Sequence, residues 1–408
     1  MTSNSARLAA GYFVYFGAIG IFTPFWSPYL ALRGFDSWQI GLLLAASGAA
    51  RVIGPLVIGW IADASGRPTR ILRLTAALSA AIFALLPVVQ GLAGFLALTV
   101  LFSFCWNSFV PLYDAHTLAH LGEQRARYGL IRLWGSVGFI VLSWAGGAAF
   151  EHSGYEAMPL LMFALIAVTL LMTLATAAMT PAATVPGAQG FRAALRSRDV
   201  IVALVVAALV GTSFGPYYVF FSLYLEQHGY SRGAIGFLWA LGVIAEIGVF
   251  AYGRSLLGRF SIRMLFVLAA AGSALRWAAI GLFVEHPIAI ALAQLLHCLG
   301  FAVLHLAMVL TAQRMFPRGL ESRGQALFSG MTYGVGGALG SVLAGLTWSA
   351  FSPRASYLGA AFIVVLAALY AALGLRAGAL DYDGAGALDN ESAGAPGGGS
   401  FTVTRRET

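Results

Sequence analysis

The sequence contains an internal repeat, which constrains its fold more than any other feature. Residues 20–30 (GIFTPFWSPYL) align without gaps with residues 215–225 (GPYYVFFSLYL), and Gly, Phe, Ser, Tyr and Leu coincide. The same register places Arg51 opposite Glu246, and both lie inside apolar runs. Chance similarity between apolar segments would match Leu and Ala rather than Gly, Ser and aromatic residues. Two related bundles in tandem, each with an internal charge, are the layout of a secondary transporter.

The composition predicts a membrane protein. Of 408 residues, 59% are hydrophobic and 10% are charged, with a mean hydropathy of +0.82, whereas soluble proteins carry about 25% charged residues. A bilayer-spanning helix needs about 20 apolar residues, so the apolar runs predict an all-α polytopic membrane protein with twelve transmembrane helices. The first run is too long for a cleavable signal peptide. The predicted spans are residues 8–32, 38–62, 70–90, 93–119, 129–150, 156–180, 199–226, 233–254, 262–284, 287–312, 322–349 and 354–376.

These spans form two predicted pseudo-symmetric six-helix bundles. The first bundle occupies residues 1–180, a cytoplasmic linker follows over 181–198, and the second bundle occupies 199–376. The tail over 377–408 is rich in Gly, Ala, Asp and Ser, a composition that favours disorder. Because one chain contains both bundles, we expect a monomer to be sufficient for transport.

The distribution of basic residues predicts the orientation. Lysine does not occur, so all 24 basic residues are Arg. Most fall in loops on one side of the predicted membrane, and only Arg33, Arg232 and Arg354 fall on the other. The positive-inside rule therefore predicts a multi-pass protein of the bacterial cytoplasmic (inner) membrane with both termini in the cytoplasm. Since the arginines are spread over many loops, the net charge of +8 does not indicate nucleic-acid binding.

The residue types exclude several activities. A nucleotide-binding P-loop and a Schiff base both require Lys, which the sequence lacks. No HExxH motif occurs, and the histidines lack metal-ligand spacing. We therefore expect no enzymatic activity, no metal and no cofactor. A gradient, expected to be of protons, would supply the driving force, or the protein would simply equilibrate its ligand across the membrane.

The loop between the second and third spans carries the most specific motif. It follows the pattern G-x-x-x-D-x-x-G-R-x-x-R through Gly59, Asp63, Gly66, Arg67 and Arg70. The glycines permit close helix approach and a tight turn. Asp63 is placed to pair with Arg67 or Arg70, or to accept hydrogen bonds from a helix N-terminus. The loop resembles the signature of the major facilitator superfamily and departs from it at Pro68, where a second basic residue is usual. The resemblance implies a cytoplasmic gate.

Charged residues inside the spans are candidates for function because lipid makes a buried charge costly. Asp114 and Arg132 are equally spaced from the middle of their connecting loop, so antiparallel helices bring them to the same depth. Arg276 and His297 flank an external turn in the same way, and Glu246 is expected within reach of the Arg276 side chain. The alternative is that these residues form structural pairs that fix helix packing.

The balance of these charges favours an anionic substrate. Two acids, Asp114 and Glu246, accompany three arginines inside the spans. One guanidinium is therefore left for a substrate anion. The three are Arg51, Arg132 and Arg276.

Three further segments narrow the resemblance. Residues 128–139 (YGLIRLWGSVGF), 20–26 (GIFTPFW) and 295–298 (LLHC) resemble the phenylpropionate permease branch of the superfamily. That branch is similar to the lactose permeases, and the resemblance extends over about residues 8–376.

The resemblance implies roles for individual residues. In the lactose permeases, an acid and an Arg that match Asp114 and Arg132 bind the sugar. Their Glu, Arg and His in spans 8, 9 and 10 match Glu246, Arg276 and His297. Their proton-carrying Glu falls at Gly300, which cannot hold a proton. Proton coupling is therefore expected to use other groups, namely Glu246, His297, His305 and Asp114.

The sequence thus predicts a proton-coupled importer of a small aromatic carboxylate such as 3-phenylpropionate, working by alternating access. Trp26 and Tyr218 are predicted to add aromatic surface to a site containing Arg132, Arg276, Asp114 and Arg51. Aromatic surface also suits a sugar, so proton symport of a neutral sugar or nucleoside is the alternative. A proton-coupled exporter would share the fold and gate, whereas a membrane sensor or intramembrane enzyme lacks a supporting motif.

Overall fold

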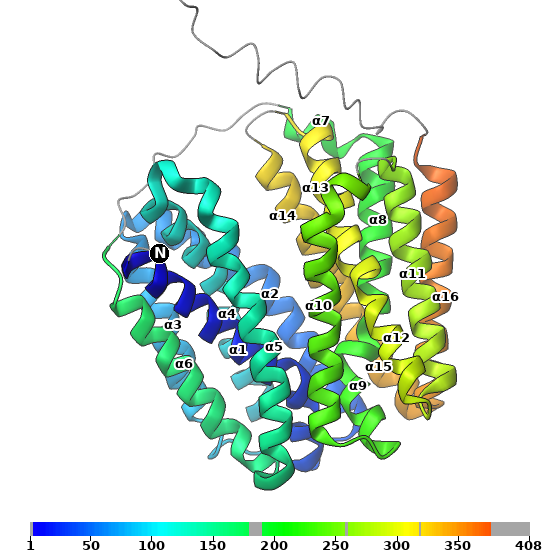
Figure 1. Cartoon of the computed structure of the whole chain (residues 1–408), viewed down its shortest axis with the longest axis horizontal. Coiled ribbons are helices and arrows are strands. Elements are labelled where there is room, and N and C mark those ends of the chain that lie inside the picture. Colours follow the sequence, from blue (N-terminus) through cyan, green and yellow to red (C-terminus); the bar gives the residue numbers. More distant parts are fainter. Residues whose placement is uncertain (1–2, 179–189, 258–259, 318–319, 377–408) are drawn as a thin grey trace, which may run out of the picture.

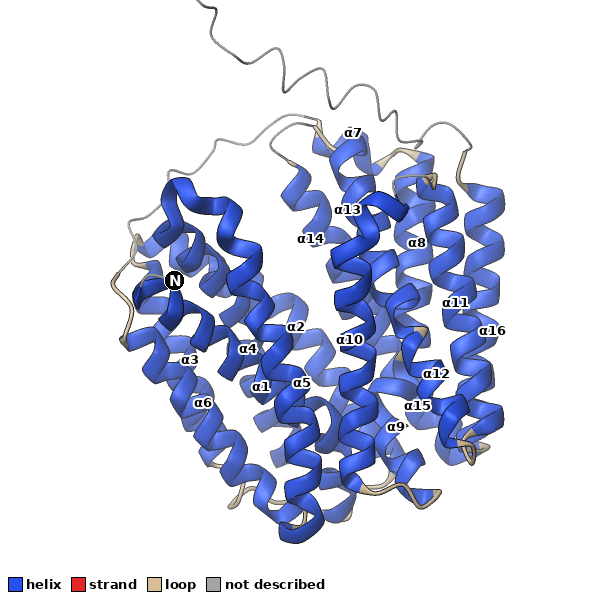
Figure 2. Ribbon diagram, viewed as in Figure 1, coloured by secondary structure: helices blue, strands red, loops and turns tan. Residues whose placement is uncertain are grey.

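The computed structural model describes residues 3–178, 190–257, 260–317 and 320–376. Within these ranges the chain forms helices and turns and contains no strand (Figure 2). Residues 181–189 of the predicted linker and the whole predicted tail, 377–408, lie outside the described residues.

The helices form two groups that lie side by side (Figure 1). The first bundle contains α1 (Ser3–Leu32), α2 (Ser37–Ser65), α3 (Pro68–Ala84), α4 (Gly91–Leu121), α5 (Tyr128–Ser153) and α6 (Met158–Leu174). The short α7 (Phe191–Leu195) leads into the second bundle. The second bundle contains α8 (Arg198–Ser213), α9 (Gly215–Gln227), α10 (Arg232–Leu257), α11 (Ile262–Phe283), α12 (Pro287–Leu295), α13 (Leu304–Met315), α14 (Glu321–Ser329), α15 (Gly337–Ala350) and α16 (Pro353–Gly374).

The described helices account for twelve membrane crossings. Ten stretches are long and apolar enough to cross a membrane, and one of them, Gly91–Ser153, contains both α4 and α5. These two helices are joined by the tight turn η1 (Gly122–Arg127). The 17-residue α3 packs against α4 and α6 as the remaining crossing. The predicted all-helical fold is therefore confirmed.

Three crossings of the second bundle are interrupted where the sequence indicated continuous spans. The seventh breaks at Phe214, just before Pro216 at the start of α9. The tenth contains the π-helical stretch η3 (Leu299–Val303), and the eleventh contains η4 (Gly330–Gly336). Such irregularities within membranes occur where surrounding protein satisfies the backbone, and π-helical turns are frequent at functional sites.

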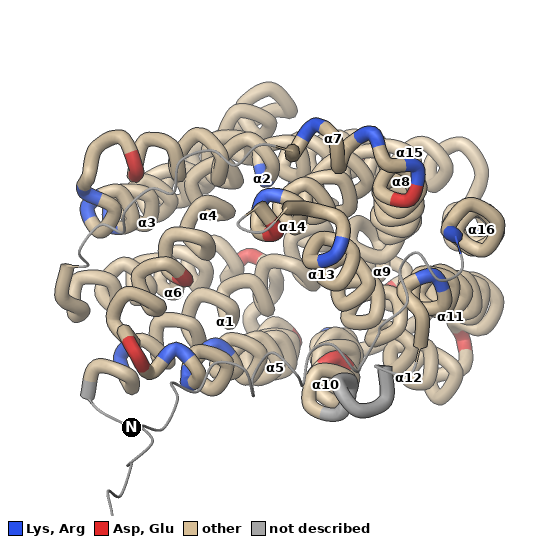
Figure 3. Tube along the Cα trace, turned by 90° about the horizontal axis from the view of Figure 1, so that it is seen from above, with Lys and Arg blue, Asp and Glu red and all other residues tan. Residues whose placement is uncertain are grey.

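The two bundles converge at one end and diverge at the other (Figure 1). We call the diverging end, which holds η1, α7 and the turn at Gly66, the arginine-rich end. Figure 3 views the molecule from this end, with Arg positions around the rims of the bundles. Contacts between bundles run through α5 with α10, α2 with α15 and α1 with α9. Arginines of the described part that mark this end are Arg67, Arg70, Arg73, Arg125, Arg127, Arg192, Arg196 and Arg198.

Two glycines that occupy equivalent positions in the internal repeat bring the bundles together at the opposite end. A Cβ on Gly41 would lie 2.7 Å from the carbonyl oxygen of Ser341. A Cβ on Gly236 would lie 2.2 Å from the carbonyl oxygen of Ser143. Both distances are too short for a real Cβ atom. The bundles can therefore approach this closely only because both positions are glycine.

Packing inside the first bundle depends on a similar contact at Gly138. A Cβ there would lie 2.0 Å from the carbonyl oxygen of Phe13. We expect Gly138→Leu to push α5 away from α1 and to cost about 1–3 kcal/mol, as overpacking does. The apparent melting temperature in detergent should fall by several degrees. The control is Gly129→Leu on the same helix, because a Cβ at Gly129 would meet no atom within 4 Å. Equal melting temperatures for the two variants would contradict the close packing at Gly138.

Candidate functional site

A chain of three ionisable side chains crosses the interior of the second bundle. Arg276 on α11 places Nη1 2.8 Å from Nδ1 of His297. Nε2 of His297 lies 2.7 Å from Oε1 of Glu246 on α10. Arg276 is 1% exposed and His297 5% exposed, so the three groups interact away from bulk water.

The partners assign the tautomer of His297. A guanidinium has only donors and stays charged in proteins, so Nδ1 of His297 must accept from Arg276. Nε2 therefore carries the proton and donates it to the Glu246 carboxylate. In this geometry His297 is neutral. The direct Glu246–Arg276 contact expected from the sequence is wrong in this conformation, because the imidazole stands between the two charges.

Gln294, which sequence reasoning missed, is a second hydrogen-bond partner of Arg276, whose Nε is buried without a partner among the described residues. Its Oε1 accepts from Arg276 Nη2 at 2.8 Å and from the Tyr217 hydroxyl at 3.2 Å. The guanidinium also lies 4.0 Å from the ring centroid of Tyr217 and 4.5 Å from that of Trp277. The available signal was a glutamine one turn before His297 within an apolar run.

Gly300 and His305, which the sequence analysis also considered for proton coupling, are not part of the chain of three side chains. A Cβ on Gly300 would lie 2.4 Å from Oγ of Ser273, so this position has no room for an acidic side chain without rearrangement. His305 interacts electrostatically with Glu246 and approaches the ring of Phe250 at 6.3 Å. It forms no hydrogen bond or ion pair within the described ranges, and its coupling role stays a prediction.

A second charged pair lies in the first bundle. Arg132 Nε on α5 is 4.0 Å from Asp114 Oδ1 on α4, so the predicted common depth is correct. Tyr12 on α1 donates to the same oxygen at 2.6 Å. The Arg132 guanidinium lies 3.9 Å from the ring centroid of Phe16. The Asp114 and Arg132 side chains are 29% and 31% exposed. A ligand can therefore reach this pair, whereas Arg276 and His297 of the second bundle are enclosed.

Of the three arginines predicted inside the spans, Arg51 on α2 is the one without an ion pair or side-chain hydrogen bond to a described residue. It is exposed, and its neighbour Val52 packs against Gly334 of η4. Arg51 therefore lies near the junction of the two bundles.

The two predicted aromatic residues have different surroundings. Trp26 is 3% exposed and stacks against Phe22 at 4.9 Å and Tyr29 at 5.6 Å. It is a packing residue of the first bundle in this conformation, and its place in the substrate site stays a prediction. Tyr218 is half-buried, stacks on Phe214 at 5.5 Å and interacts electrostatically with Glu246.

The predicted gate motif is open. Gly66 ends α2 with φ of 60°, and its N–H bonds to the carbonyl of Asp63, which explains the requirement for glycine at this turn. The Asp63 carboxylate is exposed and has no ion pair with any residue of the described part, and Arg67 and Arg70 are exposed. The expected Asp63 pairing is thus not formed in this conformation. A Cβ on Gly59 would meet nothing within 4 Å, so the close approach expected there is also not made.

A polar network, which the sequence did not indicate, joins the bundles at the opposite end. Arg232 Nε lies 3.5 Å from Glu226 Oε1, and Arg232 Nη1 donates to the carbonyl of Phe150. Tyr155 donates to Glu226, and the Arg232 guanidinium lies 4.3 Å from the Tyr155 ring centroid. We call Tyr155, Glu226 and Arg232 the seal.

Comparisons with known proteins agree with this architecture. Residues 5–359 match the MFS_1 like family. The chain belongs to this family. A "Probable 3-phenylpropionic acid transporter" of Escherichia coli (strain K12) is 33% identical over 85% of this chain and 92% of its own length. A "Maltose permease" of Geobacillus stearothermophilus is 29% identical over 85% and 88%. A solved structure of a mutant of the nucleoside transporter NupG superposes with a TM-score of 0.83 at 18% identity, over 92% of this chain and 100% of that chain.

Family membership confirms the predicted major facilitator fold and the predicted class. The chain is a secondary transporter of the major facilitator type that handles a small-molecule substrate in a membrane, and it is not an enzyme. The resemblance to the phenylpropionate permease branch is also confirmed. Nothing in the comparisons tests the domain boundaries or the roles of individual residues.

Removing the Arg232 side chain should loosen the seal. In a background with Cys105 and Cys298 replaced by Ala, a reporter Ser143→Cys lies beside the contact with Gly236. We expect Arg232→Gln to accelerate maleimide labelling of this reporter about five- to thirtyfold, as a loss of 1–2 kcal/mol implies. Arg354→Gln, at the same end of the second bundle, is the control. Unchanged labelling in Arg232→Gln would show that the seal does not hold this end closed.

Proposed function

We propose that the protein is a proton-coupled importer of a small aromatic carboxylate, of the 3-phenylpropionate kind, that works by alternating access. Its arginine-rich end, with both chain termini, would face the bacterial cytoplasm. The conformation, closed at the seal and open at the gate motif, would then be inward-facing. One chain contains both bundles and would act without a second copy.

The observation that carries the proposal is a pair of unsatisfied groups on opposite bundles. Arg51 has no acidic partner within the described chain, and the hydroxyl of Tyr333 is buried without a hydrogen-bond partner. Their chain neighbours Val52 and Gly334 are in contact across the two bundles. A carboxylate between them would accept from both, which favours an anion over a neutral ligand.

The side chains around these groups suit an aromatic acid. Arg132, with its face on Phe16, offers a second partly exposed guanidinium. Tyr218 and Phe301 add aromatic surface from the other bundle, where Phe301 stacks on His297 at 5.5 Å. An aromatic ring stacks on such surfaces while the carboxylate takes the guanidinium. The relative described as a probable 3-phenylpropionic acid transporter supports this substrate class.

Proton coupling is assigned to the chain of Glu246, His297 and Arg276, with Asp114 as the second acid. Glu246 is 12% exposed and forms the accessible end of the chain. When Glu246 gains a proton, the negative charge that balances Arg276 is lost, and the site attracts a substrate carboxylate more strongly. Release of the proton and the substrate to the cytoplasm would restore the starting charges, and the bundles would rock back around the midplane.

Proton symport of a neutral sugar or nucleoside is the second candidate. It is favoured by the relatives described as a maltose permease and a putative nucleoside transporter. Asp114 and Tyr12 at the edge of the open pair could accept and donate hydrogen bonds to hydroxyl groups. A neutral ligand could accept hydrogen bonds from both groups but would leave the Arg51 charge without a counter-charge, and this ranks the candidate second.

Proton movement can be measured directly in energy-depleted cells in a lightly buffered suspension. Addition of 3-phenylpropionate or cinnamate should raise the external pH above that of vector-only cells, which account for passive entry of weak acids. A galactoside and a nucleoside should cause no change. In Glu246→Gln cells the alkalinisation should disappear, whereas Glu123→Gln on the exposed turn η1 should keep it. Alkalinisation by the nucleoside or galactoside alone would replace the first candidate with the second.

Removal of the Arg51 charge should selectively weaken recognition of the carboxylate. Loss of a charge-assisted hydrogen bond costs about 1.5–3 kcal/mol, so Arg51→Gln should raise the Kd for 3-phenylpropionate about ten- to hundredfold. The Kd for the uncharged 3-phenylpropionamide should change less than threefold. Binding to purified protein by calorimetry checks both values. An equal loss for acid and amide would mean that Arg51 supports the fold rather than the anion.

A further inference from the structure

A crevice of about 690 Å³ lies outside the transport site, on the outer side of the first bundle. It is formed by the last turn of α1, the last turn of α3 and the first turns of α6, all at the end opposite the arginine-rich end. Both α3 and α6 lie at the edge of the molecule, away from the second bundle (Figure 1). The crevice therefore faces the lipid that surrounds the protein.

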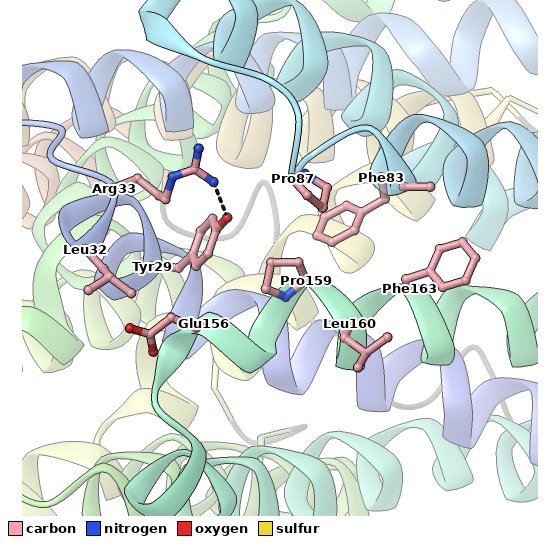
Figure 4. Close-up of a pocket in the computed structure, with 10 residues that line it drawn as sticks. Tyr29, Leu32, Arg33, Phe83, Pro87, Glu156, Pro159, Leu160 and Phe163 are labelled. Carbon is pink, nitrogen blue, oxygen red and sulfur yellow. Dashed lines mark hydrogen bonds between the residues drawn. The ribbon is translucent and has the colours of Figure 1, made fainter.

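The floor and walls of the crevice are apolar. Leu32 lines it at its charged end and Pro159 lies in the middle. Phe83, Leu160 and Phe163 line the other end (Figure 4). Leu160 is 73% exposed and Leu32 is 49% exposed. A crevice of this kind in a membrane is filled by hydrocarbon.

One end of the crevice carries two opposite charges that do not pair with each other. Arg33 and Glu156 lie on the two sides of Tyr29 (Figure 4). Arg33 donates to the Tyr29 hydroxyl at 2.8 Å and to the carbonyl of Val89 at 3.2 Å, which holds the guanidinium in place and leaves other N–H groups free. Glu156 is exposed and forms no ion pair within the described residues.

We propose that this crevice binds a phospholipid whose head group carries a primary ammonium beside its phosphate. The phosphate would take the free donors of Arg33, and the ammonium would donate to Glu156. One acyl chain would lie against Leu160 and Phe163. From Glu156 to Phe163 the helix rises about 10 Å, at 1.5 Å per residue, which matches the upper part of a chain in a hydrocarbon core about 30 Å thick.

The arrangement of charges discriminates between lipid classes. Phosphatidylglycerol has the phosphate without the ammonium, so Glu156 would repel it. Phosphatidylcholine has a quaternary ammonium that cannot donate a hydrogen bond to Glu156. Phosphatidylethanolamine satisfies both charges. The proposal is independent of which substrate the transporter carries.

Native mass spectrometry of the purified full-length chain, titrated with lipids of identical acyl chains, tests this site. We expect phosphatidylethanolamine to bind about three- to tenfold more tightly than phosphatidylglycerol. Glu156→Gln should abolish this preference, because the exposed amide no longer attracts ammonium or repels a net negative charge. Arg33→Gln should weaken both lipids. Arg354→Gln, at the same end of the second bundle and outside the crevice, should change neither.

Equal affinities of the two lipids for the unmodified chain, or an unchanged preference in Glu156→Gln, would overturn the proposal and indicate non-selective annular lipid. Displacement of the bound lipid by 3-phenylpropionate would assign the crevice to substrate instead. Leu160→Trp narrows the crevice from an exposed position and should reduce retention of every lipid, with an unchanged melting temperature as the check on folding. Retention equal to that of the unmodified chain would also count against the site.

Discussion

The structure depends on how a guanidinium is accommodated inside a bilayer, with hydrogen bonds to Nη1 and Nη2 and none to the buried Nε among the described residues. Arg276 is almost fully buried, and burying an unpaired charge is one of the most costly arrangements available to a protein. Here the charge is shared between Gln294, a neutral His297 and the faces of two aromatic rings. The carboxylate that balances it is one imidazole away. Under the proposed function, a proton could bind at Glu246 without breaking either of the hydrogen bonds that Arg276 makes.

The two bundles use their charges differently even though their sequences are related. In the second bundle the acid, the imidazole and the guanidinium are enclosed and in hydrogen-bond contact. In the first, Asp114 and Arg132 are about one-third exposed and 4.0 Å apart, and Arg51 has no acidic partner in the described chain. Under the proposed function, this difference assigns the proton to the enclosed chain and the substrate anion to the open pair and Arg51. The division follows from solvent access, since a ligand can reach only groups that are not already enclosed.

Sequence reasoning succeeded where position along a helix decides the outcome. Equal spacing about a turn placed Asp114 and Arg132 at one depth, and the rise of two antiparallel helices is enough to bring them together. It could not predict the direction in which a side chain points, because that direction depends on the rotation of the helix about its axis. Trp26 faces its own bundle, and Gln294 faces Arg276, and the apolar runs around both residues have no polar face that would indicate direction. Direct pairing of Glu246 with Arg276 failed for a related reason, because similar depth does not specify which side chain stands between two others.

The same geometry accounts for a formed seal together with an open gate motif in this conformation. The bundles approach so closely at Gly41 and Gly236 that even a Cβ would collide with the opposite backbone. Rigid bundles held together at that end are separated at the other, which leaves the Asp63 carboxylate exposed and without an ion pair among the described residues. The seal residues Tyr155, Glu226 and Arg232 gain their contacts in this state. The free energy of the seal contacts therefore opposes that of the gate-motif contacts. The difference between these two free energies sets which end is open. Under the proposed function, a substrate or proton has to change only that difference to reverse the transporter.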